Sequence, residues 1–316
     1  MEISAKILTP EDDFISRNIE DYPEGIIIPI NKPYRWTSAD VIRKVKYAAI
    51  RHFGKKNLKV GHAGTLDPLA TGVLLVCIGK ATKLAETLQS HDKEYIAGVT
   101  FGATTPSYDL EKEIDRFFPH EHITEEGIQA ALPGFIGEQD QVAPLFSAKS
   151  VDGVRAYELA RKLYKETGEN PAVVSSTEAG DTSSESGTTE SASSDFDAAA
   201  ERLLRVSRIH ISELELLSFT NGSLSEAEGE WRTDSEDRAT QSASSRINVT
   251  DNSSLGLPRA SIRMACSKGT YVRAFARDLG ETLGTGAHLD SLQRSRSGIF
   301  RVENALSVEQ AIALLA

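Results

Sequence analysis

The sequence has little of what marks secreted, membrane-spanning or metal-binding proteins. Its two cysteines, Cys77 and Cys266, lie in apolar strand-like runs, where a thiol behaves as a small buried hydrophobic group. They have no metal-ligand spacing and predict no disulfide framework. No run approaches the roughly 18 apolar residues of a membrane helix, and the N-terminus lacks the apolar core of a signal peptide. We expect a soluble cytoplasmic protein that needs neither a metal nor a cofactor.

Positive charge is also scarce, since the 316 residues include 46 acidic and 35 basic side chains and carry a formal net charge of −11. An RNA-binding protein usually has a basic surface, so this balance argues at first against RNA. The acidic excess, however, is confined to three segments. Residues 1–24 hold seven acidic and two basic residues, residues 166–200 eight and none, and residues 223–256 seven and three. The rest of the chain is net basic and remains compatible with an RNA partner.

The stretch 59–72, KVGHAGTLDPLATG, places His62 and Asp67 among three glycines, directly before the apolar run 73–78. Glycine allows the backbone to approach a ligand closely, and Pro68 biases Asp67 toward an extended conformation. A carboxylate on a stiff corner beside a buried strand is typical of a functional site. On spacing alone, an Asp-Pro turn that only connects two strands explains the pattern equally well.

Three motifs in the sequence resemble those of the TruB-type tRNA pseudouridine synthases. They are GHAGTLDPLATG at 61–72, CSKGTYVR at 266–273 and AHLDSLQR at 287–294, and the resemblance extends over about residues 25–165, 205–222 and 257–316. It implies an α+β fold, with a mixed, mostly antiparallel sheet flanked by helices around a central cleft. Gln293 departs from the arginine that is usual in the third motif, which removes one possible RNA contact.

The resemblance also implies the roles of individual residues. Asp67 is the carboxylate that acts on the uridine, Arg273 pairs with it, and Tyr271 is a candidate for the final proton transfer at C5. Five other residues are implied to bind substrate or brace the site: Tyr95 stacks on the extruded base, Leu292 walls the pocket, His62 takes the place of the flipped nucleotide, Lys32 braces the loop, and Arg294 contacts RNA. By residue type alone, Tyr95 would be a core aromatic and Arg273 a helix-surface arginine.

The chain is expected to form one catalytic domain over residues 25–316, preceded by a loosely ordered acidic extension at 1–24. Segments 168–200 and 223–256 are rich in Ser, Thr, Glu and Gly, cannot bury enough apolar surface to fold alone, and are interpreted as insertions. Ser38 is predicted to cap a helix that reaches about Arg51, and residues 157–163 are predicted to be helical. A small RNA-binding domain, which many bacterial relatives add after the last helix, is expected to be absent.

The expected function is conversion of uridine to pseudouridine at position 55, in the T-loop of tRNA, by a monomer that binds the T-arm stem-loop. Two alternatives remain: a guide-dependent synthase of the box H/ACA type, and a non-catalytic tRNA-folding chaperone. The basic surplus of the core is expected to line one cleft, with the following candidates: Lys80, Lys83, Arg273, Arg277, Arg294 and Arg296.

Overall fold

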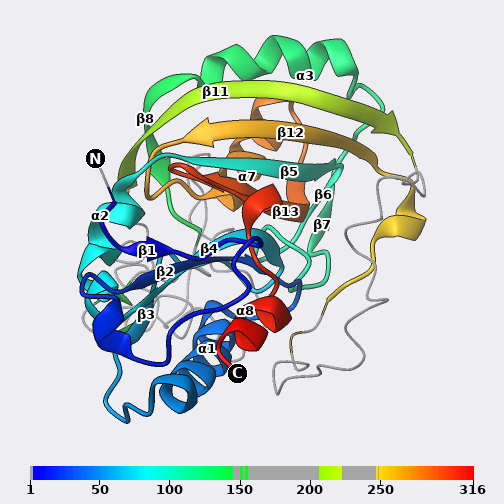
Figure 1. Cartoon of the computed structure of the whole chain (residues 1–316). Helices are drawn as coiled ribbons and strands as arrows, with labels where there is room; N and C mark the ends of the chain where they lie inside the picture. The colour runs from blue at the N-terminus through cyan, green and yellow to red at the C-terminus, as the bar shows by residue number, and fades with distance from the viewer. Residues whose placement is uncertain (1–2, 145–149, 152–153, 156–205, 223–246, 248) are drawn as a thin grey trace, which may run out of the picture.

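The computed structural model describes residues 3–144, 150–151, 154–155, 206–222, 247 and 249–316. Its centre is a ten-stranded sheet in the order β1-β2-β4-β13-β5-β12-β11-β8, with β3 paired to β4 and β14 paired to β13 (Figure 1). The strands of this sheet are β1 (Lys6–Ile7), β2 (Ile26–Lys32), β3 (Val60–Ala63), β4 (Ala70–Ile78), β5 (Lys93–Phe101), β8 (Gly137–Val142), β11 (Val206–Asn221), β12 (Pro258–Cys266), β13 (Ala287–Ser297) and β14 (Phe300–Arg301).

Two short two-stranded sheets and several helices complete the described fold. The small sheets pair β6 (Ala103–Thr104) with β7 (Arg116–Phe117), and β9 (Ser150–Val151) with β10 (Val154–Arg155). The α-helices are α1 (Ser38–Phe53), α2 (Ala85–Ser90), α3 (Glu125–Ala131), α7 (Val272–Thr282) and α8 (Val308–Leu314). None of the helices in these described ranges is long and apolar enough to cross a membrane.

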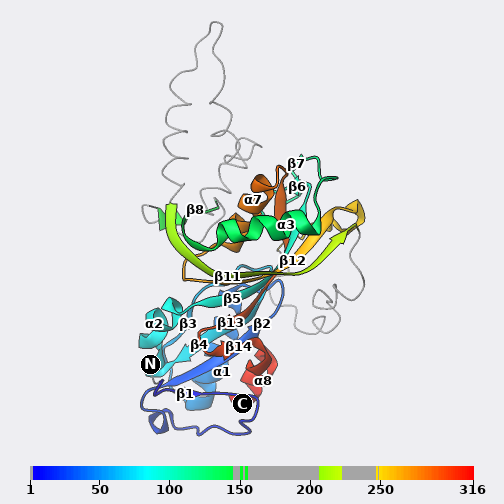
Figure 2. The same ribbon diagram turned by 90° about the horizontal axis from the view of Figure 1, so that it is seen from above.

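The large sheet is mixed and mostly antiparallel, as predicted. Among its described strands, the parallel pairs are β1 with β2 and β4 with β13. Helices α1 and α8 pack on one face of β2 and β4, while α3 and α7 cover β5, β11 and β12 (Figure 2). Every residue of β4 is buried, because neighbours cover both of its faces. The α+β class expected from the sequence is therefore confirmed.

The expectation of a loosely ordered N-terminal extension was wrong for residues 3–24. Strand β1 pairs with β2 in parallel, through Lys6 opposite Ile26 and Ile7 opposite Ile27. Leu8 and Ile15 are 0% and 1% exposed and belong to the core that α1 and α8 cover. The segment is acidic on average, but a few apolar side chains are enough to fasten it, since burial of each is worth about 1.5–3 kcal/mol.

Helix α1 is capped one residue earlier than predicted. The Thr37 hydroxyl accepts from the Asp40 backbone N–H, and the Asp40 carboxylate accepts from the Thr37 N–H, which together form a capping box. Ser38 is instead the first helical residue, and its hydroxyl is free to bond the loop that carries Asp67. The helix predicted at 157–163 and the segment 168–200 lie outside the described residues.

The described end of the second expected insertion packs against the core. The Thr250 backbone N–H donates to the Leu110 carbonyl at 2.9 Å, and the Asn252 amide lies 3.3 Å from Nε2 of the buried His288. Arg35 also donates to the Ile247 carbonyl at 3.1 Å. Low-complexity composition therefore overstates the length of this insertion, since residues near its C-terminal end contact the loops around the site.

Candidate active site

Asp67 occupies a rigid corner between β3 and β4. The Ser38 hydroxyl, at the start of α1, donates to the Leu66 carbonyl at 3.2 Å and accepts from the Leu66 N–H at 3.0 Å. The Ala70 N–H then closes a turn by donating to the Asp67 carbonyl at 3.1 Å. The Asp67 side chain stays 37% exposed. Its backbone is thus fixed from both sides while its carboxylate faces the open side of the turn.

Lys32, the last residue of β2, is fully buried and braces this corner from behind. Its ammonium donates to the carbonyls of Pro33 at 2.9 Å, Trp36 at 2.6 Å and Pro68 at 3.2 Å. Burial lowers the pKa of Lys32 to about 7, with the nearby Asp67 carboxylate acting in the opposite direction. Lys32 therefore ties the loop 33–36 to the residue that follows Asp67.

The prediction that Arg294 contacts RNA was wrong. The Arg294 side chain lies on β13 and is 1% exposed, which leaves no surface for a phosphate. Its guanidinium donates to the carbonyls of Val73 at 2.7 Å, Gly64 at 3.2 Å and Thr65 at 3.5 Å. Gly72 has φ +97°, and the Arg294 backbone fills the space that a side chain there would need. Arg294 holds the glycine-rich loop from within the protein.

Arg273, in the first turn of α7, is 4% exposed and lies between two carboxylates. Its Nε atom is 2.9 Å from Oδ2 of Asp67 and 3.7 Å from Oδ2 of Asp109, and its Nη1 donates to the Ser107 carbonyl at 3.1 Å. Burial tends to lower the pKa of Arg273, but the two carboxylates outweigh burial and raise it. The guanidinium is therefore a permanent positive charge beside Asp67.

Asp109 is the site residue that the sequence analysis missed. Its carboxylate accepts from the Ser107 hydroxyl at 2.6 Å and from the Glu111 N–H at 3.0 Å, and burial raises its pKa while Arg273 opposes that rise. The run Ser107-Tyr108-Asp109, with φ +55° at Tyr108, has the residue types of a tight turn. That pattern indicates a turn, but nothing in it indicates that the turn contacts Arg273.

A pocket of about 280 Å³, open to solvent, lies in front of these groups. It is lined by Asp67, Leu69, Ala70, Asp109, Leu110, Arg273, Leu289, Asp290, Ser291 and Leu292. Three of these residues carry carboxylates, with exposed fractions of 37% for Asp67, 11% for Asp109 and 6% for Asp290. Arg259 and Thr100 already hydrogen-bond the Asp290 carboxylate, at 3.1 and 2.8 Å. Asp67 is therefore the carboxylate best placed to reach a bound molecule.

Three residues implied by the resemblance stand around the pocket rather than in its lining. Tyr95, on β5, lies opposite Arg294 in the strand register, and burial raises the pKa of its hydroxyl. Tyr271 precedes α7 and is fixed by two hydrogen bonds between its backbone and the Gln141 side chain, at 2.8 and 3.1 Å. His62, on β3, is partly buried, and burial lowers its pKa.

Within the described ranges, no three His, Cys, Asp or Glu side chains gather as a metal site would require.

The six cations expected to line one cleft do not form an exposed basic surface. Arg273 and Arg294 are buried. Three of the others have acidic neighbours: Arg277 pairs with Asp278 at 2.7 Å, Lys80 lies 3.7 Å from Glu24, and Arg296 lies 3.8 Å from Glu94. Lys83 remains exposed. Their spacing in the sequence gave no information on these partners, and the expectation was wrong.

Comparisons with known proteins identify the class and then the family. The fold matches two solved structures, "Structure of H/ACA RNP bound to a substrate RNA containing 2'-deoxyuridine" and "Crystal structure of the archaeal box H/ACA sRNP Nop10-Cbf5 complex", each with a TM-score of 0.50 and 18% identity. The matches cover 99% and 100% of this chain but only 64% and 65% of the solved chains. This is the catalytic fold of the pseudouridine synthases.

Sequence similarity is much higher to curated bacterial proteins named tRNA pseudouridine synthase B. The chain is 43% identical to that of Phocaeicola vulgatus and 42% to that of Bacteroides thetaiotaomicron, in both cases over 92% of each chain. It is 37% identical to that of Flavobacterium johnsoniae, over 92% of this chain and 95% of the other. Residues 51–194 match the model of the TruB family pseudouridylate synthase N-terminal domain. The chain belongs to the TruB family.

Proposed function

We infer that the protein converts uridine to pseudouridine in tRNA, at position 55 of the T-loop, with Asp67 as the reacting carboxylate. The observation that carries this inference is the 2.9 Å contact between Asp67 and the buried Arg273 at the wall of the pocket. The similarity over most of both chains to proteins named tRNA pseudouridine synthase B supports the same reaction. We also expect a cytoplasmic monomer that binds the T-arm stem-loop.

The reaction requires a nucleophile or an anion beside the sugar and base, but no energy source. The N1–C1′ bond breaks, the base turns within the pocket, and a C5–C1′ bond forms. The proton that leaves C5 is balanced by one gained at N1, so that no atom is added or lost. A base inside a folded RNA must first be extruded to reach such a pocket. Asp67 would attack the nucleotide or stabilise the positive charge that develops on the sugar.

Arg273 places a buried positive charge 2.9 Å from this carboxylate, at the wall of the pocket. Leu292 is part of the pocket wall. We assign Tyr95 to stacking on the extruded base, a contact worth roughly 1–3 kcal/mol, and His62 to the place that the base leaves in the RNA. We assign the final proton transfer at C5 to Tyr271, which lies two residues before Arg273 and whose backbone the Gln141 side chain fixes.

The two alternatives are less well supported. A chaperone that only refolds tRNA has no use for a carboxylate held against a buried arginine. The H/ACA structures share 18% identity with this chain, whereas the relatives named tRNA pseudouridine synthase B share about 40% over nine-tenths of both chains. A guide-dependent reaction is therefore not favoured.

The test is an incubation of the purified chain with an unmodified tRNA, without any guide RNA, followed by mapping of pseudouridine. We expect Asp67→Asn to give no detectable product while its affinity for tRNA stays within a few-fold of wild type, because the amide keeps the shape but loses the charge. Asp92→Asn, at an exposed position, is the control and should react normally. Turnover by Asp67→Asn would remove Asp67 from the reaction, and product formation only with a guide RNA would favour the H/ACA type.

A further inference from the structure

The segment of the chain that precedes Asp67, residues 41–66, is strongly cationic. Between residues 41 and 66 the sequence has seven Lys or Arg residues and no Asp or Glu, although the whole chain carries a net charge of −11. The seven are Arg43, Lys44, Lys46, Arg51, Lys55, Lys56 and Lys59, and all are exposed. We call the solvent-facing side of α1 and the loop 54–59, with these seven residues, the α1 cationic face.

Most of this charge has no acidic partner among the residues that the structure describes. Arg43 pairs with Asp40 at 2.9 Å and Lys55 with Glu20 at 3.1 Å. In the part of the chain that the structure describes, no acidic side chain lies within 4.0 Å of the other five cationic groups, which are Lys44, Lys46, Arg51, Lys56 and Lys59. By contrast, Lys80, Arg277 and Arg296 nearer the sheet all have acidic partners. Five exposed cations without an acidic partner in the described ranges therefore lie close together on this one helix and loop.

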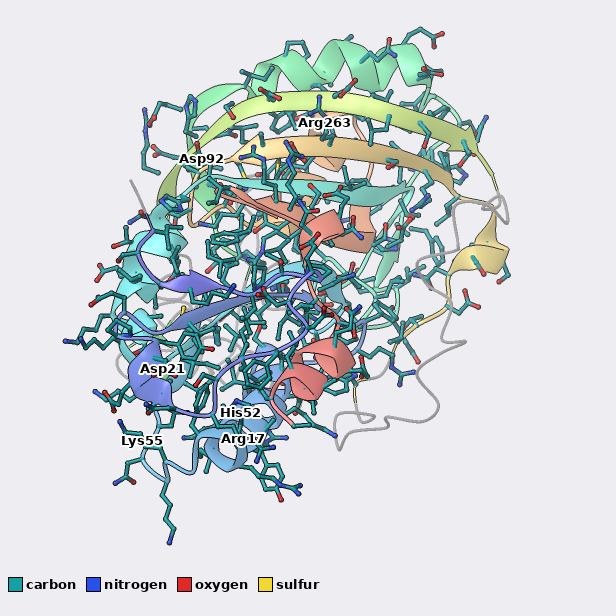
Figure 3. The ribbon with its side chains drawn as sticks, in the orientation of Figure 1. Arg17, Asp21, His52, Lys55, Asp92 and Arg263 are labelled. Carbon is teal, nitrogen blue, oxygen red and sulfur yellow. The ribbon has the colours of Figure 1, made fainter. Side chains whose placement is uncertain are left out.

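The face begins at the active site and leads away from it. Ser38 opens α1 and is hydrogen-bonded to Leu66, the residue before Asp67. At a rise of about 1.5 Å per residue, Lys44, Lys46 and Arg51 lie roughly 9, 12 and 20 Å along the helix from Ser38. Figure 3 places Lys55, on the loop after α1, at the opposite end of the molecule from Arg263 on β12. A ligand seated in the pocket must therefore extend about 20 Å along α1 to reach Arg51, and further to reach the loop 54–59.

The composition of the face matches a nucleic acid rather than a protein or a small anion. Its cations are spread along a helix rather than converging on one point, which suits a row of phosphates. Tyr47 lies on the same side of α1 and is 73% exposed, and unpaired bases stack on exposed aromatic rings of this kind. Apolar α1 residues such as Val41 and Val45 face the core and are buried, so the exposed side carries no hydrophobic stripe for a partner helix.

We propose that the α1 cationic face binds the phosphate backbone of the substrate tRNA outside the T-arm. This inference rests on the proposed function, since it takes tRNA to be the molecule seated in the pocket. The face would extend recognition from the reacting base to the body of the tRNA. It would also explain how a chain with an acidic total charge holds a polyanion.

The test compares binding of two RNAs, a full-length unmodified tRNA and its isolated T-arm stem-loop. Two double variants probe the face near the site and far from it: Lys44→Gln/Lys46→Gln and Arg51→Gln/Lys56→Gln. The matched control is Lys6→Gln/Arg301→Gln, which removes the same charge from exposed positions on β1 and β14. Unchanged thermal unfolding of all three variants shows that any loss of binding is not a loss of fold.

We expect each double variant to bind full-length tRNA about 10-fold more weakly at low salt, and the slope of log affinity against log salt to fall by roughly 1.4–1.8, since each lost phosphate contact removes about 0.7–0.9. Binding and turnover of the T-arm stem-loop should stay within two-fold of wild type, as should every property of the control. Tyr47→Ala should weaken tRNA binding without changing the salt slope.

Three results would overturn the proposal: full-length tRNA bound equally by wild type and both variants, equal weakening for both RNAs, or equal weakening by the control. The first would mean that the face only keeps the protein in solution, and the second that it contacts the T-arm itself. The third would mean that net charge alone matters. None of these bears on the pocket, because absence of pseudouridine from the wild-type reaction is the separate result that would refute the proposed function.

Discussion

Two buried arginines contact the loop that carries Asp67 and serve it differently. Arg273 faces carboxylates, with Asp67 at 2.9 Å and Asp109 at 3.7 Å. Arg294 faces no carboxylate among the described residues; its guanidinium donates to the carbonyls of Val73, Gly64 and Thr65 and also lies beside the Tyr95 hydroxyl. Both stand in sequence motifs and both were expected at the site. The difference shows that a motif arginine can serve either the chemistry or the loop that carries it, according to its partners.

The partners decide what each arginine can do. A guanidinium between two carboxylates sets the charge of the pocket, and Asp67 remains 37% exposed and accessible to a ligand. A guanidinium among carbonyls satisfies acceptors that a tight loop cannot pair with its own N–H groups. The first arrangement predicts an effect on reaction rate with a smaller effect on stability. The second predicts the reverse, and variants of the two residues can separate these effects.

The largest expected effect is that of Arg273→Met on activity. Loss of the charge beside Asp67 should lower kcat by about 10³-fold, as loss of one preorganised electrostatic partner does in other enzymes. Stability should change less, because Asp67 is partly solvated and Asp109, whose pKa burial already raises, can take up a proton. The rate is measured by single-turnover pseudouridine formation, and the stability is measured by thermal unfolding. A variant that retained more than a tenth of the wild-type rate would contradict this role.

Arg294→Met should show the opposite pattern. Two buried carbonyls, of Val73 and Gly64, and the partly buried carbonyl of Thr65 would lose their donor, and each unsatisfied buried acceptor costs about 1–3 kcal/mol, so we expect the unfolding free energy to fall by roughly 3–5 kcal/mol. Turnover per folded molecule should stay within about ten-fold of wild type at a temperature where the variant is folded. Denaturant unfolding measures the loss of unfolding free energy. Arg294→Lys is the control and should recover part of the stability, because an ammonium keeps the charge but cannot match the fork of the guanidinium.

The third prediction concerns Lys32, which lies behind the same loop. Burial lowers its pKa from 10.5 to about 7. The unfolded chain keeps the ordinary value, so between about pH 7 and 10 the unfolded state binds more protons and unfolding becomes less favourable as the pH rises. We expect the stability of wild type relative to Lys32→Met to increase over this range, by about 1 kcal/mol or more. Parallel pH profiles of unfolding free energy for the two proteins would show that Lys32 does not titrate there.

Much of the fold followed from local patterns in the sequence. The apolar alternation in 209–216 is typical of a strand and lies in β11, the apolar run 73–78 forms most of β4, and the spacing of Ser307 and Gln310 is that of a capping box, which they form at the start of α8. The N-terminal segment was misjudged because its composition is acidic, whereas the pairing of β1 with β2 and the burial of Leu8 and Ile15 fasten it to the core. Average composition says little about a segment that a few apolar side chains can anchor.

The resemblance of three motifs pointed to the family and implied that Asp67 associates with Arg273, while the sequence by itself determined the position of Asp67 on a stiff glycine-rich corner. It could do so because the conformational limits of glycine and proline act on neighbouring residues and leave a readable motif. Only the tertiary structure decided that Asp109 completes the charge arrangement, that Arg294 faces carbonyls, and that five cations on α1 and the loop after it have no acidic partner among the described residues. These are contacts between segments far apart in the chain, and a side chain acquires its partner, its burial and hence its pKa only when the sheet brings those segments together.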